Sequence, residues 1–181
     1  MSRTLIKSGT VLTASDTFAA DVWIENGKIA ALVAPGTVLG TADTTIDATG
    51  QYVIPGGIDC HTHMSLPFGG TTASDDFDTG TVAAAHGGTT TIVDFAIQSK
   101  GSSMRAGLDA WFAKSEGQAA IDYGFHMIMT EANPSTLDEM SAMVREGITS
   151  FKLFMAYPGV FLVDDQQIFR AMQRAGDLGA L

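Results

Sequence analysis

Two of the chain's four histidines, His61 and His63, stand two positions apart in the short stretch DCHTHM at residues 59–64. In an extended segment, side chains at i and i+2 point to the same side, so two imidazoles at this spacing can share one metal ion. Imidazole is a good ligand for zinc, iron and nickel. The motif is short, and it leaves open a pair of hydrogen-bonded surface histidines. Asp59 is a candidate ligand, a partner of a ligand, or merely a strand-end acid.

A lysine interrupts an apolar run further along the chain. Lys152 is the one charged residue in FKLFM, residues 151–155. A buried ammonium is costly unless it is paired or chemically changed. One interpretation is an amine that reaches water at the end of the strand. The other is a neutral amine that has reacted with carbon dioxide, which gives an anionic carbamate able to bridge two cations.

The two remaining histidines are weaker candidates. His86 precedes Gly87 and Gly88 at an expected helix end, where a histidine interacts favourably with the helix dipole. His126 lies inside an apolar strand pattern, which is more typical of a hydrogen-bonded core residue than of a ligand.

The elements that must position these residues fall into two groups. The first 50 residues predict short strands, and Asn26-Gly27 predicts a hairpin turn between two of them. These strands are expected at residues 5–6, 11–12, 21–24 and 28–32.

From Tyr52 onward, strand-like and helix-like segments alternate. Strands are expected at residues 52–59, 89–96, 121–130 and 148–157, and helices at 74–88, with Ser74 as N-cap, 103–118, 135–147 and 164–176. Apolar strands separated by helices predict a parallel sheet. Four such units make half of an eight-unit barrel or a complete small doubly wound sheet. Ligands bind at the carboxyl ends of such strands. His61 and His63 are expected just past the end of the first strand, 52–59.

Composition excludes several classes of function. The 181 residues carry a formal net charge of −10, which argues against binding nucleic acid or an anionic membrane surface. A single cysteine, Cys60, allows no intrachain disulfide, and the amino-terminal residues lack the pattern of a signal peptide. No apolar run approaches the roughly 20 residues of a membrane span. We therefore expect a cytoplasmic protein.

Three stretches together resemble the cyclic amidohydrolases, specifically the dihydropyrimidinase/hydantoinase branch. They are YVIPGGIDCHTHM at 52–64, DDFDTGTVAAAHGGTTTIVDF at 75–95 and GITSFKLFMAYPG at 147–159. The resemblance covers essentially the whole chain. It implies an α/β fold in which residues 53–181 form the first four βα units of a TIM-type (β/α)8 barrel. Residues 1–52 would then be the N-terminal part of a small β-sandwich domain.

The resemblance also implies a site and a reaction. His61 and His63 would bind metal, and a carbamylated Lys152 would bridge two divalent ions, commonly zinc in this family. Tyr157 would bind the substrate and stabilise the attacked carbonyl, while Phe68 and Phe161 would be apolar walls. Phe161 could equally be ordinary loop packing. The reaction is the hydrolysis of a dihydropyrimidine or hydantoin ring, a small cyclic amide, to an N-carbamoyl amino acid.

The chain departs from the family pattern in its later part. That pattern needs two further histidines and an aspartate on later strands, and no histidine follows His126. We therefore expect a partial or truncated form of an enzyme whose parent is a homotetramer. The alternatives are a non-catalytic tetrameric scaffold, an allantoinase-like or dihydroorotase-like hydrolase, and an unrelated small α/β binding domain.

Overall fold

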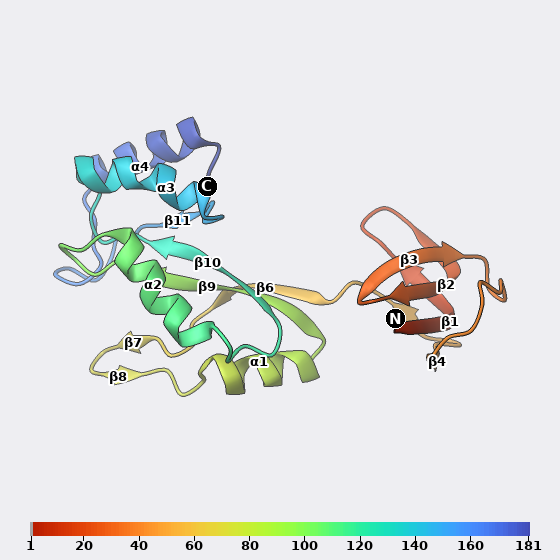
Figure 1. The fold of residues 1–181 in the computed structure, drawn as a ribbon. Helices are drawn as coiled ribbons and strands as arrows, with labels where there is room; N and C mark the ends of the chain where they lie inside the picture. Colours follow the sequence, from red (N-terminus) through yellow and green to blue (C-terminus); the bar gives the residue numbers. More distant parts are fainter. Residues whose placement is uncertain (1) are drawn as a thin grey trace. The chain divides into compact units, whose positions relative to one another are not determined.

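The computed structural model describes residues 2–181 (Figure 1). The chain forms two compact units, residues 1–55 and 56–181. Within residues 2–181, no helix is both long and apolar enough to cross a membrane.

The first unit is built on one five-stranded sheet. Its strands are β1 Arg3–Leu12, β2 Thr17–Glu25, β3 Lys28–Val33, β4 Thr44–Asp47 and β5 Tyr52–Val53. They follow the order β3-β2-β1-β4, and β5 also pairs with β1. The hairpin predicted between β2 and β3 is confirmed. Asn26 and Gly27 both have positive φ, 51° and 76°, as a type I′ turn requires.

Strand β1 is one continuous strand where the sequence predicted two short ones. Its register against β2 shifts between Ile6 and Gly9, and Ser8 has a φ of 60°. The buried carboxylate of Asp21 accepts the Ser8 N–H at 2.7 Å. A β-bulge therefore interrupts the apolar alternation without ending the strand.

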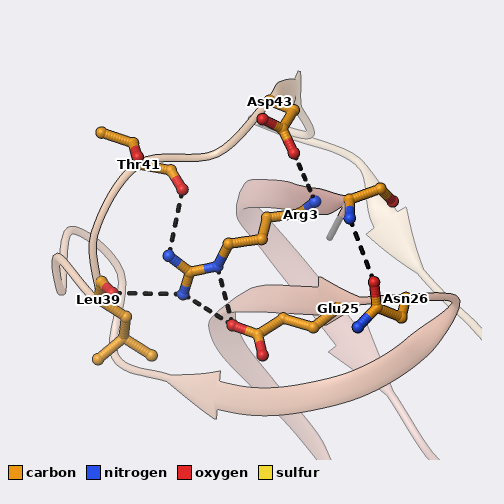
Figure 2. Close-up of polar contacts among 7 residues, drawn as sticks. Arg3, Glu25, Asn26, Leu39, Thr41 and Asp43 are labelled. Carbon is orange, nitrogen blue, oxygen red and sulfur yellow. Dashed lines mark hydrogen bonds and ion pairs between the residues drawn. The ribbon is translucent and has the colours of Figure 1, made fainter.

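Arg3 ties the loop after β3 to this sheet, as Figure 2 shows. Its guanidinium donates to Glu25 at 2.8 Å and to the carbonyl oxygens of Thr41 and Leu39 at 3.2 and 3.3 Å. Its backbone N–H donates to the Asp43 carboxylate at 2.8 Å. One side chain near the start of the chain therefore fixes a long irregular loop.

The second unit is a parallel sheet with four helices. Its sheet contains β6 Gly57–Thr62, β9 Thr89–Ile97, β10 Asp122–Ile128 and β11 Phe151–Lys152, and its helices are α1 Phe77–His86, α2 Met104–Ser115, α3 Pro134–Arg145 and α4 Asp165–Leu178. A separate hairpin, β7 Pro67–Phe68 and β8 Thr71–Thr72, lies between β6 and α1 in sequence.

The strand order decides between the two architectures that the sequence left open. The order β6-β9-β10-β11 follows the chain, as the steady change of colour across the sheet in Figure 1 reflects. A doubly wound sheet reverses its strand order at a switch point, and this sheet does not. The unit is therefore the half-barrel that was predicted.

The core lies between the sheet and its helices. The helical face predicted for α2 is confirmed, since Met104, Leu108 and Trp111 are buried. They pack with Ile92 and Met127 from the strands. Hydrophobic burial of this face is the main force that holds α2 to β9.

Three element ends differ from the predictions. The N-cap of α1 is Asp76, not Ser74, because Asp76 and Thr79 satisfy each other's backbone N–H groups in a capping box. The expected strand 52–59 is split into β5 and β6 around Pro55, which has no N–H to donate. The expected strand 148–157 is reduced to the edge strand β11 and a bridge between Phe154 and Leu162.

Candidate functional site

The paired histidines lie at the carboxyl end of β6. His61 is inside the strand and His63 directly follows it, so the prediction that both lie past the strand end was wrong for His61. Against β9, Asp59 pairs with Ile92 but Thr62 pairs with Asp94, so β6 contains one extra residue. This bulge increases the local twist, as bulges beside active sites commonly do.

A buried phenylalanine on β9 brings the site's basic residues together. The ring centroid of Phe95 lies 4.8 Å from that of His61, 5.0 Å from that of His63 and 4.7 Å from that of His126. The Nζ atom of Lys152 lies 4.2 Å from the same centroid. The rings of the two paired histidines are 5.2 Å apart. The i, i+2 spacing and the neighbouring strands therefore gather three imidazoles and one amine around one aromatic ring.

The environment of His63 favours a neutral ring. Burial lowers its pKa, and the positive charges of Lys152 and His61 lower it further, while Asp94 opposes them. Its Nδ1 atom is buried and has no hydrogen-bond partner among residues 2–181. A buried nitrogen without a hydrogen-bond partner costs free energy. A bound group could provide the partner that residues 2–181 do not provide for this atom.

Lys152 is a desolvated amine. Burial lowers its pKa. Its Nζ lies over the rings of Phe95 and Phe154, at 4.2 and 4.8 Å from their centroids. Within residues 2–181, no carboxylate forms an ion pair with it. The neutral form of the amine is therefore more highly populated here than at a solvated lysine.

Aromatic side chains form the walls of a pocket above these groups. The pocket has a volume of about 230 Å³, and its lining includes His63, Lys152, Phe68, Phe154, Tyr157 and Phe161. The Phe154 and Phe161 rings stack at 5.1 Å, and Phe68 meets Tyr157 edge to face at 5.4 Å. A flat, moderately apolar molecule of small size fits such walls.

Tyr157 has a strained backbone at the pocket rim. Its φ is 62°, which is uncommon for a residue with a side chain. Its carbonyl oxygen accepts N–H groups from Val160, Phe161 and Leu162 at 3.0 to 3.2 Å. This turn compensates the strain and presents the half-exposed phenol beside Phe68 and Phe154.

Three other polar candidates have structural partners. His126 bonds Ser150 through Nδ1 and the Cys60 carbonyl oxygen through Nε2 at 3.0 Å. A carbonyl only accepts, so Nε2 carries the proton, and the expectation of a hydrogen-bonded residue is confirmed. Asp59 accepts the His61 N–H at 3.1 Å, which makes it a partner of the backbone within β6. His86 is the last residue of α1, as predicted.

The donor set fits part of a metal centre. His63 and Lys152 line one pocket, and His61 and Lys152 line a second one beside Phe95, so that Lys152 borders both. The described residues 2–181 contain no group of three or more His, Cys, Asp or Glu side chains that could hold a metal ion. His61, His63 and Lys152 therefore fit as some of the ligands of a metal, and not as a complete set.

The sequence did not identify three residues that build this site. The sequence places Asp94 and Phe95 in an expected strand at 89–96, and Phe154 in the apolar run around Lys152. An acid inside the apolar run TIVDFA carries the same signal that identified Lys152, so Asp94 could have been found. Nothing in the sequence marks Phe95 or Phe154, because their roles depend on which strands are neighbours.

The comparisons with known proteins agree with this fold. The sequence profile described as the Amidohydrolase family matches residues 52–164. The chain belongs to this family, as the resemblance predicted. The matched residues include β6, β9, β10 and β11, the strands of the parallel sheet.

Its relatives include hydantoinases and dihydropyrimidinases. A D-hydantoinase of Streptomyces coelicolor is 65% identical over 99% of this chain and 39% of its own length. A dihydropyrimidinase of Arabidopsis thaliana is 45% identical over 99% of this chain and 34% of its own length. The crystal structure of a dihydropyrimidinase from Brevibacillus agri matches 98% of this chain and 38% of its own, with a TM-score of 0.94 and 50% identity. The chain spans about two fifths or less of the length of these relatives.

Proposed function

We propose that this chain contributes the histidine pair, the bridging lysine and the oxyanion donor of an enzyme that hydrolyses cyclic amides of the hydantoin and dihydropyrimidine type. The product would be an N-carbamoyl amino acid. The observation that carries the proposal is the convergence of His63, Lys152 and Tyr157 on one small aromatic-walled pocket. The names of the relatives, D-hydantoinase and dihydropyrimidinase, support this substrate class.

His61 and His63 would hold metal through neutral imidazoles. A pair of divalent ions, with zinc as the commonest choice in this family, supplies a hydroxide nucleophile at neutral pH and polarises the amide carbonyl. The lowered pKa of His63 serves this role, because a protonated imidazole has no lone pair to donate. The Phe95 ring contacts both imidazoles, with centroids at 4.8 and 5.0 Å, and covers them on one side.

Lys152 would act as a carbamate. The ammonium would first lose one proton to solvent; the neutral amine would then attack carbon dioxide, a C–N bond would form and a second proton would leave to solvent. Loss of two protons in all turns the cation into an anion. Burial lowers the pKa of the amine and favours the neutral form that reacts. An ammonium at this position would repel two divalent cations, whereas a carbamate oxygen is a ligand for each of them.

Tyr157 would donate its phenolic hydrogen to the substrate's carbonyl oxygen. Negative charge grows on that oxygen during attack, so the hydrogen bond strengthens in the transition state. The fixed turn at Tyr157 holds the donor in place before the reaction begins.

Phe68 and Phe161 would contact the exocyclic group of the substrate, and Phe154 extends the same wall. Among residues 2–181, the lining of this pocket includes no arginine and no lysine besides Lys152, which would be an anion as a carbamate. A carboxylated substrate such as dihydroorotate would need a further cation at the wall, so the lining favours the less polar hydantoin or dihydropyrimidine class. The gathered metal-binding side chains argue against a scaffold without catalysis.

Metal analysis of variants tests the proposal. In the enzyme to which this chain contributes, Lys152→Ala removes the bridging anion, and we expect bound metal to fall from about two ions per subunit to one or none by elemental analysis. Lys100→Ala, at an exposed lysine, is the matched control and should retain the full content. Ring opening of hydantoin and of dihydrouracil should fall with the metal.

A rescue experiment separates a carbamate from a lysine that only packs. Acetate or propionate can place a carboxylate in the space that Lys152→Ala leaves, so added short carboxylic acids should restore part of the metal content and the hydrolysis. Unchanged metal content in Lys152→Ala would contradict the bridging role, and no hydrolysis of either ring by the metal-loaded protein would contradict the substrate class.

A further inference from the structure

A buried carboxylate lies directly behind the histidine pair. Asp94 is next to Phe95 on β9 and is fully buried. Successive side chains of a strand point to opposite faces, so Phe95 faces the histidines and Asp94 faces the other way. There α2 packs against β9 (Figure 1), and its Trp111 donates the indole Nε1–H to Asp94 Oδ1 at 3.1 Å.

The same carboxylate holds the backbone on both sides of His63. Asp94 Oδ2 accepts the hydroxyl of Thr62 at 2.9 Å and the backbone N–H of Met64 at 2.7 Å. With the N–H of Phe95 on Oδ1 at 2.7 Å, the two oxygens accept four hydrogen bonds. A buried carboxylate is costly without such partners, so this arrangement is satisfied in one geometry and resists change.

A second contact from α2 fixes the next residue. Lys114, one turn beyond Trp111, donates to the Ser65 carbonyl oxygen at 3.0 Å and lies 3.9 Å from the centroid of the Trp111 ring. Ser65 has a φ of 50°, and its N–H donates to the Asp75 carbonyl oxygen at 2.7 Å. The strained turn that ends the histidine segment is therefore clamped from both sides.

We propose that Asp94 and Trp111 are positioning residues that fix the direction of His61 and His63 through Thr62 and Met64. The inference rests on the proposed function, because it concerns the ligands of the metal. It connects Trp111 of helix α2, through Asp94, to the backbone that carries the imidazole nitrogens of His61 and His63. Loss of an outer hydrogen bond of this kind typically costs 10–100-fold in metal affinity.

The test measures cobalt(II) affinity by chelator competition in the whole protein, together with the visible spectrum of bound cobalt. Trp111→Phe removes the indole N–H and keeps most of the packing. Its matched control is Trp23→Phe, because Trp23 is also buried but its Nε1 has no hydrogen-bond partner among residues 2–181. Thr62→Val removes the hydroxyl at nearly constant shape, and Thr62→Ser restores it.

We expect Trp111→Phe and Thr62→Val to weaken cobalt binding by about 10–100-fold and to shift the ligand-field bands at saturation. Thr62→Ser and Trp23→Phe should stay within about threefold of the parent protein. Circular dichroism confirms that each variant is folded at the assay temperature, so that a loss of stability alone is not counted as a loss of affinity.

Two other outcomes would overturn the inference in distinguishable ways. In the first, Trp111→Phe and Thr62→Val keep parent-like affinity and spectra while His63→Ala loses affinity strongly. The metal site would then stand, and the hydrogen bonds of Asp94 would only support packing. Parent-like affinity in His63→Ala would remove the metal site itself, and the positioning role with it.

Discussion

The Nζ atom of Lys152 lies 4.2 Å from the ring centroid of Phe95, and this ring also contacts His61 and His63. A cation over an aromatic face is stabilised by about 0.5–2 kcal/mol, but the partial burial of Lys152 still lowers the pKa of its amine. This relationship therefore leaves the amine ready to lose its proton, and it places the reacting nitrogen next to the imidazoles.

Carbamylation of Lys152 is directly observable. We expect one carbamate carbon signal per chain when the protein is equilibrated with ¹³C-bicarbonate near pH 8, and its loss when the pH is lowered, because protonation removes the nucleophilic amine. Lys152→Ala should lack the signal and Lys100→Ala should keep it. A signal that survives in Lys152→Ala would show that another amine reacts.

Tyr157→Phe tests the oxyanion donor. The substitution removes one hydroxyl and keeps the aromatic contacts with Phe68 and Phe154. We expect kcat to fall by roughly tens to a thousandfold, with a smaller change in KM, because the hydrogen bond strengthens in the transition state. Phe161→Leu, a neighbouring wall residue without a hydroxyl, should act mainly on KM. A parent-like kcat in Tyr157→Phe would show that the phenol only packs.

The order of strands and helices could be predicted from the sequence because it depends on local patterns. Apolar spacing identified α2, and the Asn26-Gly27 pair identified the hairpin. The same local patterns placed Lys152 inside an expected strand at 148–157, whereas the structure places it at the end of the short strand β11.

What the sequence could not supply depends on contacts between distant segments. The N-cap of α1 is a local exception: Ser74 and Asp76 are both good caps, and Asp76 is used because Thr79, three residues later, completes a capping box. The strand around Lys152 is short because β11 is the edge of the sheet and pairs only with β10. The role of Asp94 requires Trp111 from a helix that follows it in sequence.

The pH response of the first unit has a defined sign. Bonds from the Thr49 hydroxyl and N–H, and then the Lys7 ammonium, lower the pKa of Asp47 from 3.8 to about 2. A lowered carboxyl pKa stabilises the folded state above pH 3.8, and this stabilisation is lost as the pH falls through about 2. Thr49→Val should raise the pKa of Asp47 toward 3.8, as measured by NMR titration, and Thr37→Val should not.

Two glycines inside helices should respond in opposite ways to alanine. A Cβ on Gly107 of α2 would lie 2.4 Å from the backbone oxygen of Ile97, whereas a Cβ on Gly176 of α4 meets nothing within 4 Å. Alanine is favoured over glycine in a helix by about 0.5–1 kcal/mol, so Gly176→Ala should raise the free energy of unfolding by about that amount.

At Gly107 a steric cost outweighs the higher helix propensity of alanine, because α2 and β9 must move apart to admit the methyl group. Overpacking of this kind costs about 1–3 kcal/mol, so Gly107→Ala should lower the free energy of unfolding in urea denaturation. Because β9 carries Asp94 and Phe95, the displacement should also weaken cobalt binding, while Gly176→Ala should leave it unchanged. A stabilised Gly107→Ala variant would mean that α2 does not press against β9 as closely as the structure describes.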